Sequence, residues 1–257
     1  MQPTNYPHID MLLDTLLTRM QGVLGDKLIG LYLYGSLVTG DFDDHLSDID
    51  LLAAIASELT PAEADAIIQM HAGIVRESAQ WDNRIEVAYN TLHGLRMFKT
   101  ERGNLGIISP GEPFHIVDAG DDWLVNWYFV QVYGVTLFGV PPTSIITPVS
   151  KREFLDAVKA HILAWREYIN DIDHRPGQAY AILTMCRGLY TVRHGEHVSK
   201  RKAAEWAIET FPEWATLITN ALAWRLVPNE PNVDHAATLE ETRRFVQFAI
   251  GEMEREL

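Results

Sequence analysis

Residues 31–54 constrain the fold of this chain more than any other stretch. An apolar run ends at Gly35-Ser36, a polar loop follows, and a second apolar run carries Asp48 and Asp50. Side chains at positions i and i+2 of a strand point to the same face, so the two aspartates project together. Paired carboxylates resist joint ionisation unless a cation neutralises them, and Mg²⁺ commonly binds one or two carboxylates together with substrate phosphates. The stretch therefore predicts a magnesium site with Asp48 and Asp50 as its metal ligands.

The turn before the aspartates predicts a site for phosphate groups. Gly35 allows a tight turn, and Ser36 offers a hydroxyl group and a backbone N–H at the start of the next element, where anions bind. Gly-Ser, a polar spacer and Asp-x-Asp, in this order and between apolar strands, resemble the signature of the nucleotidyltransferase superfamily that includes DNA polymerase β. The resemblance implies transfer of a nucleoside monophosphate from a nucleoside triphosphate to an acceptor. The alternative for these residues is a surface hairpin with an acidic tip.

Composition and charge limit the possible partners. The chain has 257 residues, enough for one large domain or two modest ones, and 47% of them are hydrophobic, which provides a sizeable core. Its 21 basic and 35 acidic residues give a net charge of -14. This balance disfavours a nucleic-acid partner, because phosphate backbones are bound by clustered lysines and arginines. It favours a cationic small molecule, which an acidic cleft attracts, although acidity also serves solubility alone.

No feature of the sequence indicates secretion or membrane insertion. The N-terminus lacks the basic start and apolar block of a signal peptide, and no apolar run is long enough to span a membrane. The single cysteine, Cys186, excludes an internal disulfide and lies in an apolar stretch that is typical of a small core residue. We therefore expect a cytoplasmic protein without a membrane partner. We also expect a monomer, because nothing suggests an obligate dimer.

Hydrophobic periodicity predicts alternating helices and strands in the N-terminal half. Apolar residues at helical spacing predict a helix over 8–24, and a second helix is predicted from its N-cap Thr60 to about residue 76. A third helix is expected after Asp122, because acidic residues favour a helix start. Glycines and prolines between 91 and 120 predict loops. The predicted strands are 27–34, 49–55, 84–90 and 135–138.

Segment 139–148, rich in proline, is the best candidate for a domain boundary. Every later segment shows helical periodicity, and the predicted helices are about 150–170, 178–194, 200–210, 212–226 and 236–256. The sequence therefore predicts an α+β protein, with a mixed-sheet nucleotidyltransferase domain over 1–148 and a helical bundle over 149–257. We expect the bundle to close the active-site cleft.

Glu86 is the third acidic residue with a predicted role. It lies in the middle of a strand between two apolar residues, so it projects from the opposite face. If this strand pairs beside the strand with Asp48 and Asp50, the three carboxylates meet. Glu86 would then be either a third metal ligand or the general base that takes a proton from the acceptor hydroxyl. The residues alone do not choose between these roles, and an ordinary exposed glutamate is the alternative.

Two groups of basic residues in the C-terminal half are candidates for a functional role. Ser199 is typical of an N-cap, yet Lys200 and two further basic residues follow in the first turn, where cations oppose the helix dipole. A bound triphosphate would reverse the sign of this effect, and a solvated basic turn is the alternative. Arg187 lies in an apolar helical stretch, so it is expected to pair with a carboxylate or to point into a cleft.

The whole chain resembles the aminoglycoside adenylyltransferases that inactivate streptomycin and spectinomycin. The resemblance is carried by Leu33-Tyr-Gly-Ser36, Ser47-Asp-Ile-Asp-Leu-Leu52, Glu86-Val87, Leu183-Thr-Met-Cys-Arg187, Ser199-Lys200, Ala203-Ala-Glu-Trp-Ala207, Phe245-Val246 and Gly251-Glu252. It implies ATP as the donor, Mg²⁺ as the cofactor and a hydroxyl group of the drug as the acceptor of AMP. ATP and a cationic small molecule are the expected partners.

The resemblance also implies a role for individual residues. Asp48 and Asp50 would hold magnesium, and Glu86 would be the catalytic base. The positions that match ATP contacts or pocket residues of the family, together with the glycine of the turn, are Gly35, Ser36, Ser47, Asp122, Arg187, Lys200 and Trp224.

Two departures from the family concern the acceptor. The streptomycin pocket of the family uses a tryptophan after the third strand, where this chain reads 107–115 without one. An acidic residue ahead of the Leu-Thr-x-x-Arg helix is replaced by the stretch Pro176-Gly-Gln178. The identity of the acceptor therefore stays open. Residues that could bind a cation instead are Glu112, Asp118, Asp121 and Asp122.

Two other functions remain as alternatives. The protein could adenylylate a different metabolite or a protein hydroxyl group. It could also be a non-catalytic nucleotide-binding protein on the same fold. The intact set of Asp48, Asp50 and Glu86 disfavours the second, because a retired site has no physical reason to keep three clustered carboxylates.

Overall fold

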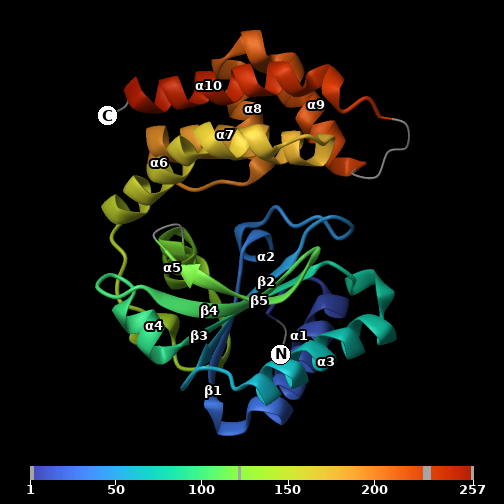
Figure 1. The fold of residues 1–257 in the computed structure, drawn as a ribbon, viewed down its shortest axis with the longest axis vertical. Coiled ribbons are helices and arrows are strands. Elements are labelled where there is room, and N and C mark those ends of the chain that lie inside the picture. The colour runs from blue at the N-terminus through green and yellow to red at the C-terminus, as the bar shows by residue number, and fades with distance from the viewer. Residues whose placement is uncertain (1–2, 121–122, 228–232, 256–257) are drawn as a thin grey trace. The chain divides into compact units, whose positions relative to one another are not determined.

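The computed structural model describes residues 3–120, 123–227 and 233–255. The chain divides into two compact units, Met1–Ser150 and Lys151–Leu257, called unit 1 and unit 2 below (Figure 1). The division lies beside the expected boundary at residue 148. The expected roles of the two halves, a catalytic domain and a domain that closes its cleft, stay predictions.

The described residues of unit 1 form a six-stranded sheet with the strand order β5-β4-β3-β2-β1-β6. The central strands β2 and β3 run parallel to each other, and the other neighbouring pairs are antiparallel. The sheet is therefore mixed, as the sequence predicted. The strands are Leu28–Tyr34 (β1), Ile49–Ile55 (β2), Ile85–Thr91 (β3), Gly103–Ser109 (β4), Glu112–Ala119 (β5) and Val135–Gly139 (β6).

One face of this sheet forms the main core of unit 1 with helices α1 (Pro7–Leu24) and α3 (Pro61–Glu77). Ile49, Leu51 and Val87 point to this face and are completely buried. Alternate residues of the same strands point to the opposite face. The core therefore fixes which residues of β2 and β3 can reach solvent on the other side.

The segment after β3 corrects one expectation. Residues 91–120 were expected to be loops because of their glycines and prolines, but they contain a short helix, α4 (Leu92–Met97), and the hairpin of β4 and β5. Gly111, with φ +78°, lies in the hairpin turn, where a glycine is favoured. Gly106 instead lies inside β4. A Cβ atom at this position would lie 2.7 Å from the ring of Phe114, so a larger residue would collide with that ring. Its glycine is needed for packing and not for a turn.

Helix α5 (Trp123–Tyr133) follows the hairpin and leads into the edge strand β6. The expected helix after the acidic pair 121–122 is thus present from Trp123 onward. Asp121 and Asp122 lie outside the described residues, so the predicted pocket role of Asp122 stays a prediction.

Unit 2 is helical in all of its longer described elements. The predicted helices are present as α6 (Lys151–Tyr168), α7 (Arg175–His194), α8 (Lys200–Thr210), α9 (Ala215–Leu226) and α10 (Leu239–Arg255). The α+β class with a helical C-terminal region is confirmed by this arrangement and by the sheet of unit 1.

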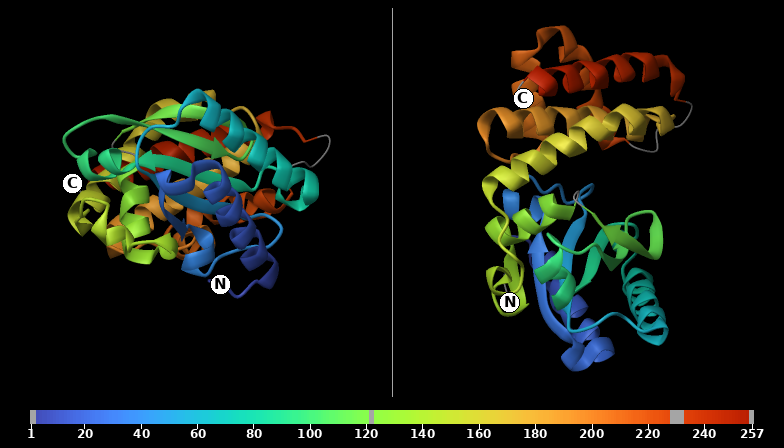
Figure 2. Two further views of the ribbon diagram at one scale, coloured as in Figure 1. Left: turned by 90° about the horizontal axis from the view of Figure 1, so that it is seen from below. Right: turned by 60° about the vertical axis from the view of Figure 1, so that its left-hand side comes forward.

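Helix α7 is the centre of the unit 2 core. It packs against α6, α8, α9 and α10, and Figure 2 shows α7 and α10 side by side. Cys186 of α7 lies in this core with none of its surface exposed, and burial raises the pKa of its thiol well above the usual range. Among the helices that the structure describes, none is both long enough and apolar enough to cross a membrane.

Candidate active site

Three neighbouring strands place Tyr34, Asp50 and Glu86 in one row across the sheet. Asp50 on β2 is the register partner of Tyr34 on antiparallel β1 and of Glu86 on parallel β3. Register partners on adjacent strands project to the same face, with Cβ atoms about 4.5–5.5 Å apart in antiparallel pairs. The sequence made the meeting of Asp50 and Glu86 conditional on pairing between their strands, and β2 and β3 are paired.

The environment of Glu86 favours its protonated form. Burial, followed by the negative charges of Asp48 and Glu112, raises the pKa of Glu86 from 4.5 to about 7. This places the charges of Asp48 and of the hairpin residue Glu112 near Glu86, in addition to its strand partner Asp50. A carboxyl group whose pKa lies near neutral pH is well matched to accept a proton in general base catalysis.

Tyr34 is the aromatic member of this row, and it lies opposite Asp50 on the neighbouring strand β1. Its side chain is 5% exposed, and burial together with the charges of Glu86 and Asp50 raises its pKa well above the usual range. Tyr34 therefore remains a neutral phenol at physiological pH. It supplies a low-dielectric wall beside the carboxylates, which strengthens the interactions among them.

Gly35 is the one residue of the turn whose identity the geometry dictates. Its φ of +76° is a conformation that glycine adopts without strain. A Cβ atom at this position would also collide with the Asp50 carboxylate. Gly35 thus gives Asp50 its space, and Ser36 follows as the first residue of the short helix α2 (Ser36–Thr39).

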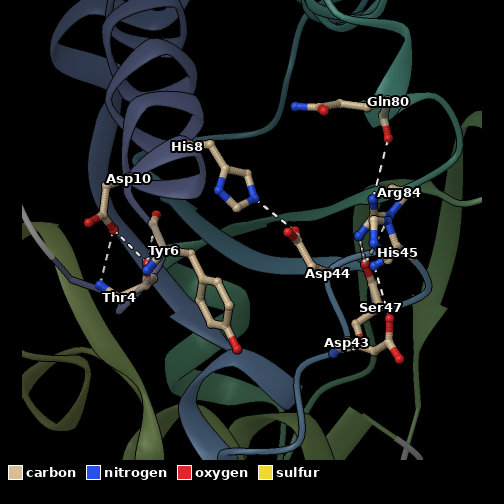
Figure 3. Close-up of polar contacts among 10 residues, drawn as sticks. All are labelled: Thr4, Tyr6, His8, Asp10, Asp43, Asp44, His45, Ser47, Gln80 and Arg84. Atoms are coloured by element: carbon tan, nitrogen blue, oxygen red, sulfur yellow. Dashed lines mark hydrogen bonds and ion pairs between the residues drawn. The ribbon is translucent and has the colours of Figure 1, made fainter.

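Ser47 closes the loop between α2 and β2 (Figure 3). Its side chain is buried, and its hydroxyl oxygen accepts a 3.0 Å hydrogen bond from the backbone N–H of Asp43. Its carbonyl oxygen accepts hydrogen bonds from the guanidinium group of Arg84. The structure thus gives Ser47 a role inside the loop, and its predicted contact with ATP stays a prediction.

The donor set of this site fits Mg²⁺. Carboxylate oxygens are hard ligands of the kind that Mg²⁺ prefers, and the ion is commonly held by one or two carboxylates together with substrate phosphates and waters. The pKa of Glu86 is raised first by burial and then by the negative charges of Asp48 and Glu112, and a bound cation would offset these charges. Within the described residues, no set of three or more His, Cys, Asp or Glu side chains is arranged as a complete metal site. Asp48 and Asp50 stay the predicted ligands.

Unit 2 carries the predicted cations on two helices. Arg187 lies on α7, and burial followed by the positive charge of Arg187 lowers the pKa of His197 well below its usual range. Lys200 is the first residue of α8, with its Nζ atom 4.8 Å from the centroid of the Tyr180 ring. The Ser199 hydroxyl accepts a hydrogen bond from a backbone N–H of the first turn, so the predicted N-cap is present. The cation–π contact offers Lys200 some compensation for its unfavourable place near the positive end of the helix dipole.

Trp224 and Gln178 have structural partners inside unit 2. The guanidinium carbon of Arg175 lies 5.1 Å from the centroid of the Trp224 ring. Gln178 is fully buried, and its amide group bonds the carbonyl oxygen of His235 and the hydroxyl group of Thr238. Gln178 therefore joins the start of α7 to the segment before α10. A contact between this side chain and an acceptor is not available in this arrangement.

Sequence reasoning did not single out Tyr34 or Arg84. Both were visible within predicted strands, and the period of two along a strand could have placed Tyr34 beside the Asp50 position. The strand pairing that makes Arg84 a neighbour of Ser47 is a long-range feature, and no local signal reveals it.

Comparison with known proteins supports the resemblance noted in the sequence. Residues 144–252 match the family model described as "Aminoglycoside adenylyltransferase, C-terminal domain". An aminoglycoside (3'') (9) adenylyltransferase of Klebsiella pneumoniae is 25% identical, and the match covers 93% of this chain and 94% of that protein. A spectinomycin 9-adenylyltransferase of Staphylococcus aureus is 27% identical, with 77% of this chain and 78% of that protein covered.

A solved structure agrees with these relatives at the level of the fold. The crystal structure of spectinomycin adenyltransferase AAD(9) from Enterococcus faecialis, with ATP and spectinomycin, matches with a TM-score of 0.72. The match covers 94% of this chain and 98% of that chain, at 17% sequence identity.

Residues 144–252 thus resemble the C-terminal domain of aminoglycoside adenylyltransferases, and the relatives named above, at 25% and 27% identity, are adenylyltransferases of aminoglycosides or spectinomycin. The matched C-terminal domain contains the three unit 2 residues with predicted ATP contacts, Arg187, Lys200 and Trp224. The relatives that cover nearly the whole chain include the region of Asp48, Asp50 and Glu86. The similarity thus extends over both units, at 25% identity.

Proposed function

We propose that this protein transfers AMP from ATP to a hydroxyl group of an aminoglycoside-like small molecule, in a reaction that depends on Mg²⁺. The observation that carries the proposal is the placement of Asp50 beside Glu86 on paired strands, with the pKa of Glu86 raised to about 7. The relatives named above are adenylyltransferases of aminoglycosides or spectinomycin.

In this proposal Glu86 is the general base. The acceptor hydroxyl attacks the α-phosphorus of ATP, a new oxygen–phosphorus bond forms, the bond to the β-phosphate breaks, and pyrophosphate leaves. Glu86 takes the proton of the hydroxyl group during this attack. Its raised pKa makes it a better proton acceptor than an ordinary glutamate, and it remains largely ionised at slightly alkaline pH.

Asp48 and Asp50 would hold Mg²⁺ in the same proposal. When bound, the ion neutralises triphosphate charge and polarises the reacting phosphoryl group. Gly35 leaves space for the Asp50 carboxylate, and Ser36 would contact the phosphates through its hydroxyl group. Arg187 and Lys200 would add positive charge to the leaving pyrophosphate.

The proposed acceptor is cationic. The net charge of the chain is -14, and Glu112 adds a carboxylate whose charge is felt at Glu86. Attraction of this kind raises the local concentration of a cation near the site. Two observations favour an acceptor contact set unlike that of streptomycin-modifying relatives: Gln178 is buried and bonded, and the β4–β5 hairpin carries no tryptophan.

The test is pyrophosphate release from ATP and Mg²⁺ across a panel of aminoglycosides that includes streptomycin and spectinomycin. Release with one drug, absent in the Asp50→Ala protein, would support the proposal and identify the acceptor. Retained Mg²⁺-dependent ATP binding in Asp50→Ala would contradict the metal assignment. Release only with other hydroxyl compounds or proteins would favour the alternative acceptor class, and tight ATP binding without turnover on any acceptor would favour a non-catalytic nucleotide-binding protein.

A further inference from the structure

The loop that leads into Asp48 is held from two sides (Figure 3). On one side, Nε2 of His8 in α1 lies 2.7 Å from Oδ1 of Asp44. On the other side, Arg84 reaches across from the residue before β3 to the carbonyl oxygen of Ser47. The loop between α2 and β2 is thus tied both to α1 and to the strand that carries Glu86.

Arg84 bonds both backbone groups that flank Asp48. Its Nε and Nη2 atoms donate hydrogen bonds of 3.1 and 2.8 Å to the Ser47 carbonyl oxygen. Its own carbonyl oxygen accepts a 2.8 Å hydrogen bond from the N–H of Ile49. Asp48 lies between these two bonded groups, so its backbone position is fixed relative to β3. The strand pairing then continues with Asp50 opposite Glu86.

The guanidinium group of Arg84 is itself held in place. Its central carbon lies 5.2 Å from the centroid of the Trp81 ring, and Trp81 is 3% exposed. The His8 ring stacks on Trp81 at a centroid distance of 6.0 Å. A planar guanidinium group that is stacked before it bonds loses little further freedom when it donates to a carbonyl oxygen. Lysine has neither this plane nor two fixed donors.

We infer that Arg84 is a positioning residue, which acts through the Ser47 carbonyl to hold the Asp48 and Asp50 carboxylates ready for the Mg²⁺ of the ATP complex. The inference rests on the proposed function. Groups that orient metal ligands from outside the ligand shell typically change metal affinity about 10–100-fold when they are removed. Arg84 has this relation to the predicted ligands through backbone bonds and not through a side-chain contact.

The experiment measures the Mg²⁺ concentration needed for half-maximal ATP binding, by calorimetry on the full chain. We expect Arg84→Met to raise this concentration about tenfold, with a thermal midpoint close to that of the wild type. Arg84→Lys, which can donate to the Ser47 oxygen but lacks the planar fork, should show a smaller rise. The matched control is Arg102→Met, because Arg102 is exposed and pairs at 3.5 Å with Asp118. It should leave the Mg²⁺ requirement unchanged.

A double-mutant comparison separates positioning from general stability. If Arg84 positions Asp48 together with Asp50, then Arg84→Met adds a smaller rise in an Asp48→Asn background than in the wild type, because coupled sites are not additive. Additive effects in the double variant, or an unchanged Mg²⁺ requirement in Arg84→Met, would overturn the inference. If Arg84→Met fails to fold, Arg84→Lys decides: a Mg²⁺ requirement equal to that of the wild type overturns it. Wild-type ATP binding that ignores Mg²⁺ would instead overturn the proposed function and this inference with it.

Discussion

Along β2 and β3, one face of the sheet carries Ile49, Leu51 and Val87, whereas the other carries Asp50 and Glu86. The residues named on the first face are completely buried in the core with α1 and α3, and on the second face burial and the charges of Asp48 and Glu112 raise the pKa of Glu86. The same two strands therefore serve stability through one set of alternate residues and chemistry through the other. Substitutions on one face should therefore change the free energy of unfolding, and substitutions on the other should change turnover.

The largest effect is expected on the carboxylate face. Glu86→Gln removes the proposed base and keeps the shape of the side chain, so turnover should fall about 10²–10⁴-fold while ATP binding is kept. The free energy of unfolding should not fall, because a neutral amide replaces a carboxyl group whose charged form is disfavoured by burial and by the charges of Asp48 and Glu112. Single-turnover kinetics and urea denaturation on the same preparation measure both. An unchanged rate would remove Glu86 from the base role.

The opposite outcome is expected on the apolar face. Leu51 is completely buried, and Leu51→Ala should lower the free energy of unfolding by about 2–5 kcal/mol through lost contacts and a new cavity. Turnover per folded molecule should stay within about twofold of the wild type, because Leu51 points away from Asp50 and Glu86. Urea denaturation measures the loss. A large fall in turnover without a fall in stability would show that the two faces are not separate.

The apolar face also holds a buried histidine with a predictable response to pH. Nε2 of His71 on α3 lies 2.9 Å from the hydroxyl oxygen of Tyr89, and burial lowers the pKa of His71 from 6.5 to about 4. Between these values the unfolded chain binds a proton that the folded protein does not, so stability falls as the pH drops from about 6.5 to about 4. The full change corresponds to about 3 kcal/mol.

His71→Gln removes this titration and keeps a group that can bond Tyr89. Its free energy of unfolding should therefore vary less between pH 7 and pH 4 than that of the wild type. His93→Gln is the control, because His93 is exposed and pairs with Glu101 on the surface. Denaturation curves at several pH values give the free energy of unfolding as a function of pH for each variant. An equal change with pH for the wild type and His71→Gln would contradict the lowered pKa of His71.

The local sequence pattern predicted those features of the fold and the site that depend on residues close together in the sequence. Thr60 caps α3 by accepting a hydrogen bond from the N–H of Glu63, and alternation along two strands placed Asp50 and Glu86 on the face away from the core. The prediction of a loop was wrong at Gly106, because this glycine lies inside a strand and leaves room for the ring of Phe114. The local pattern also could not reveal Arg84, since the bond to the Ser47 carbonyl joins residues that only the pairing of β2 with β3 brings together. Long-range register decides such contacts.

The smallest effect is expected at the edge of the carboxylate face. Glu112 begins β5, and 63% of its side chain is exposed, yet its charge is felt at Glu86. Exposed charges contribute little in water, so Glu112→Gln should raise the KM for a cationic acceptor only about threefold, with kcat nearly unchanged. The rise should shrink at high salt, because screening weakens interactions between exposed charges.

Asp118→Asn is the matched control for this last comparison. Asp118 lies near the other end of β5 and pairs with Arg102, so its removal changes the net charge equally without touching the surroundings of Glu86. Steady-state kinetics at low and high salt, with the acceptor found in the panel, measure both variants. A rise in KM for Glu112→Gln alone would assign acceptor attraction to the carboxylate face of the sheet. Equal rises in both variants would instead assign it to the overall acidity of the chain, because the position of the lost charge would then not matter.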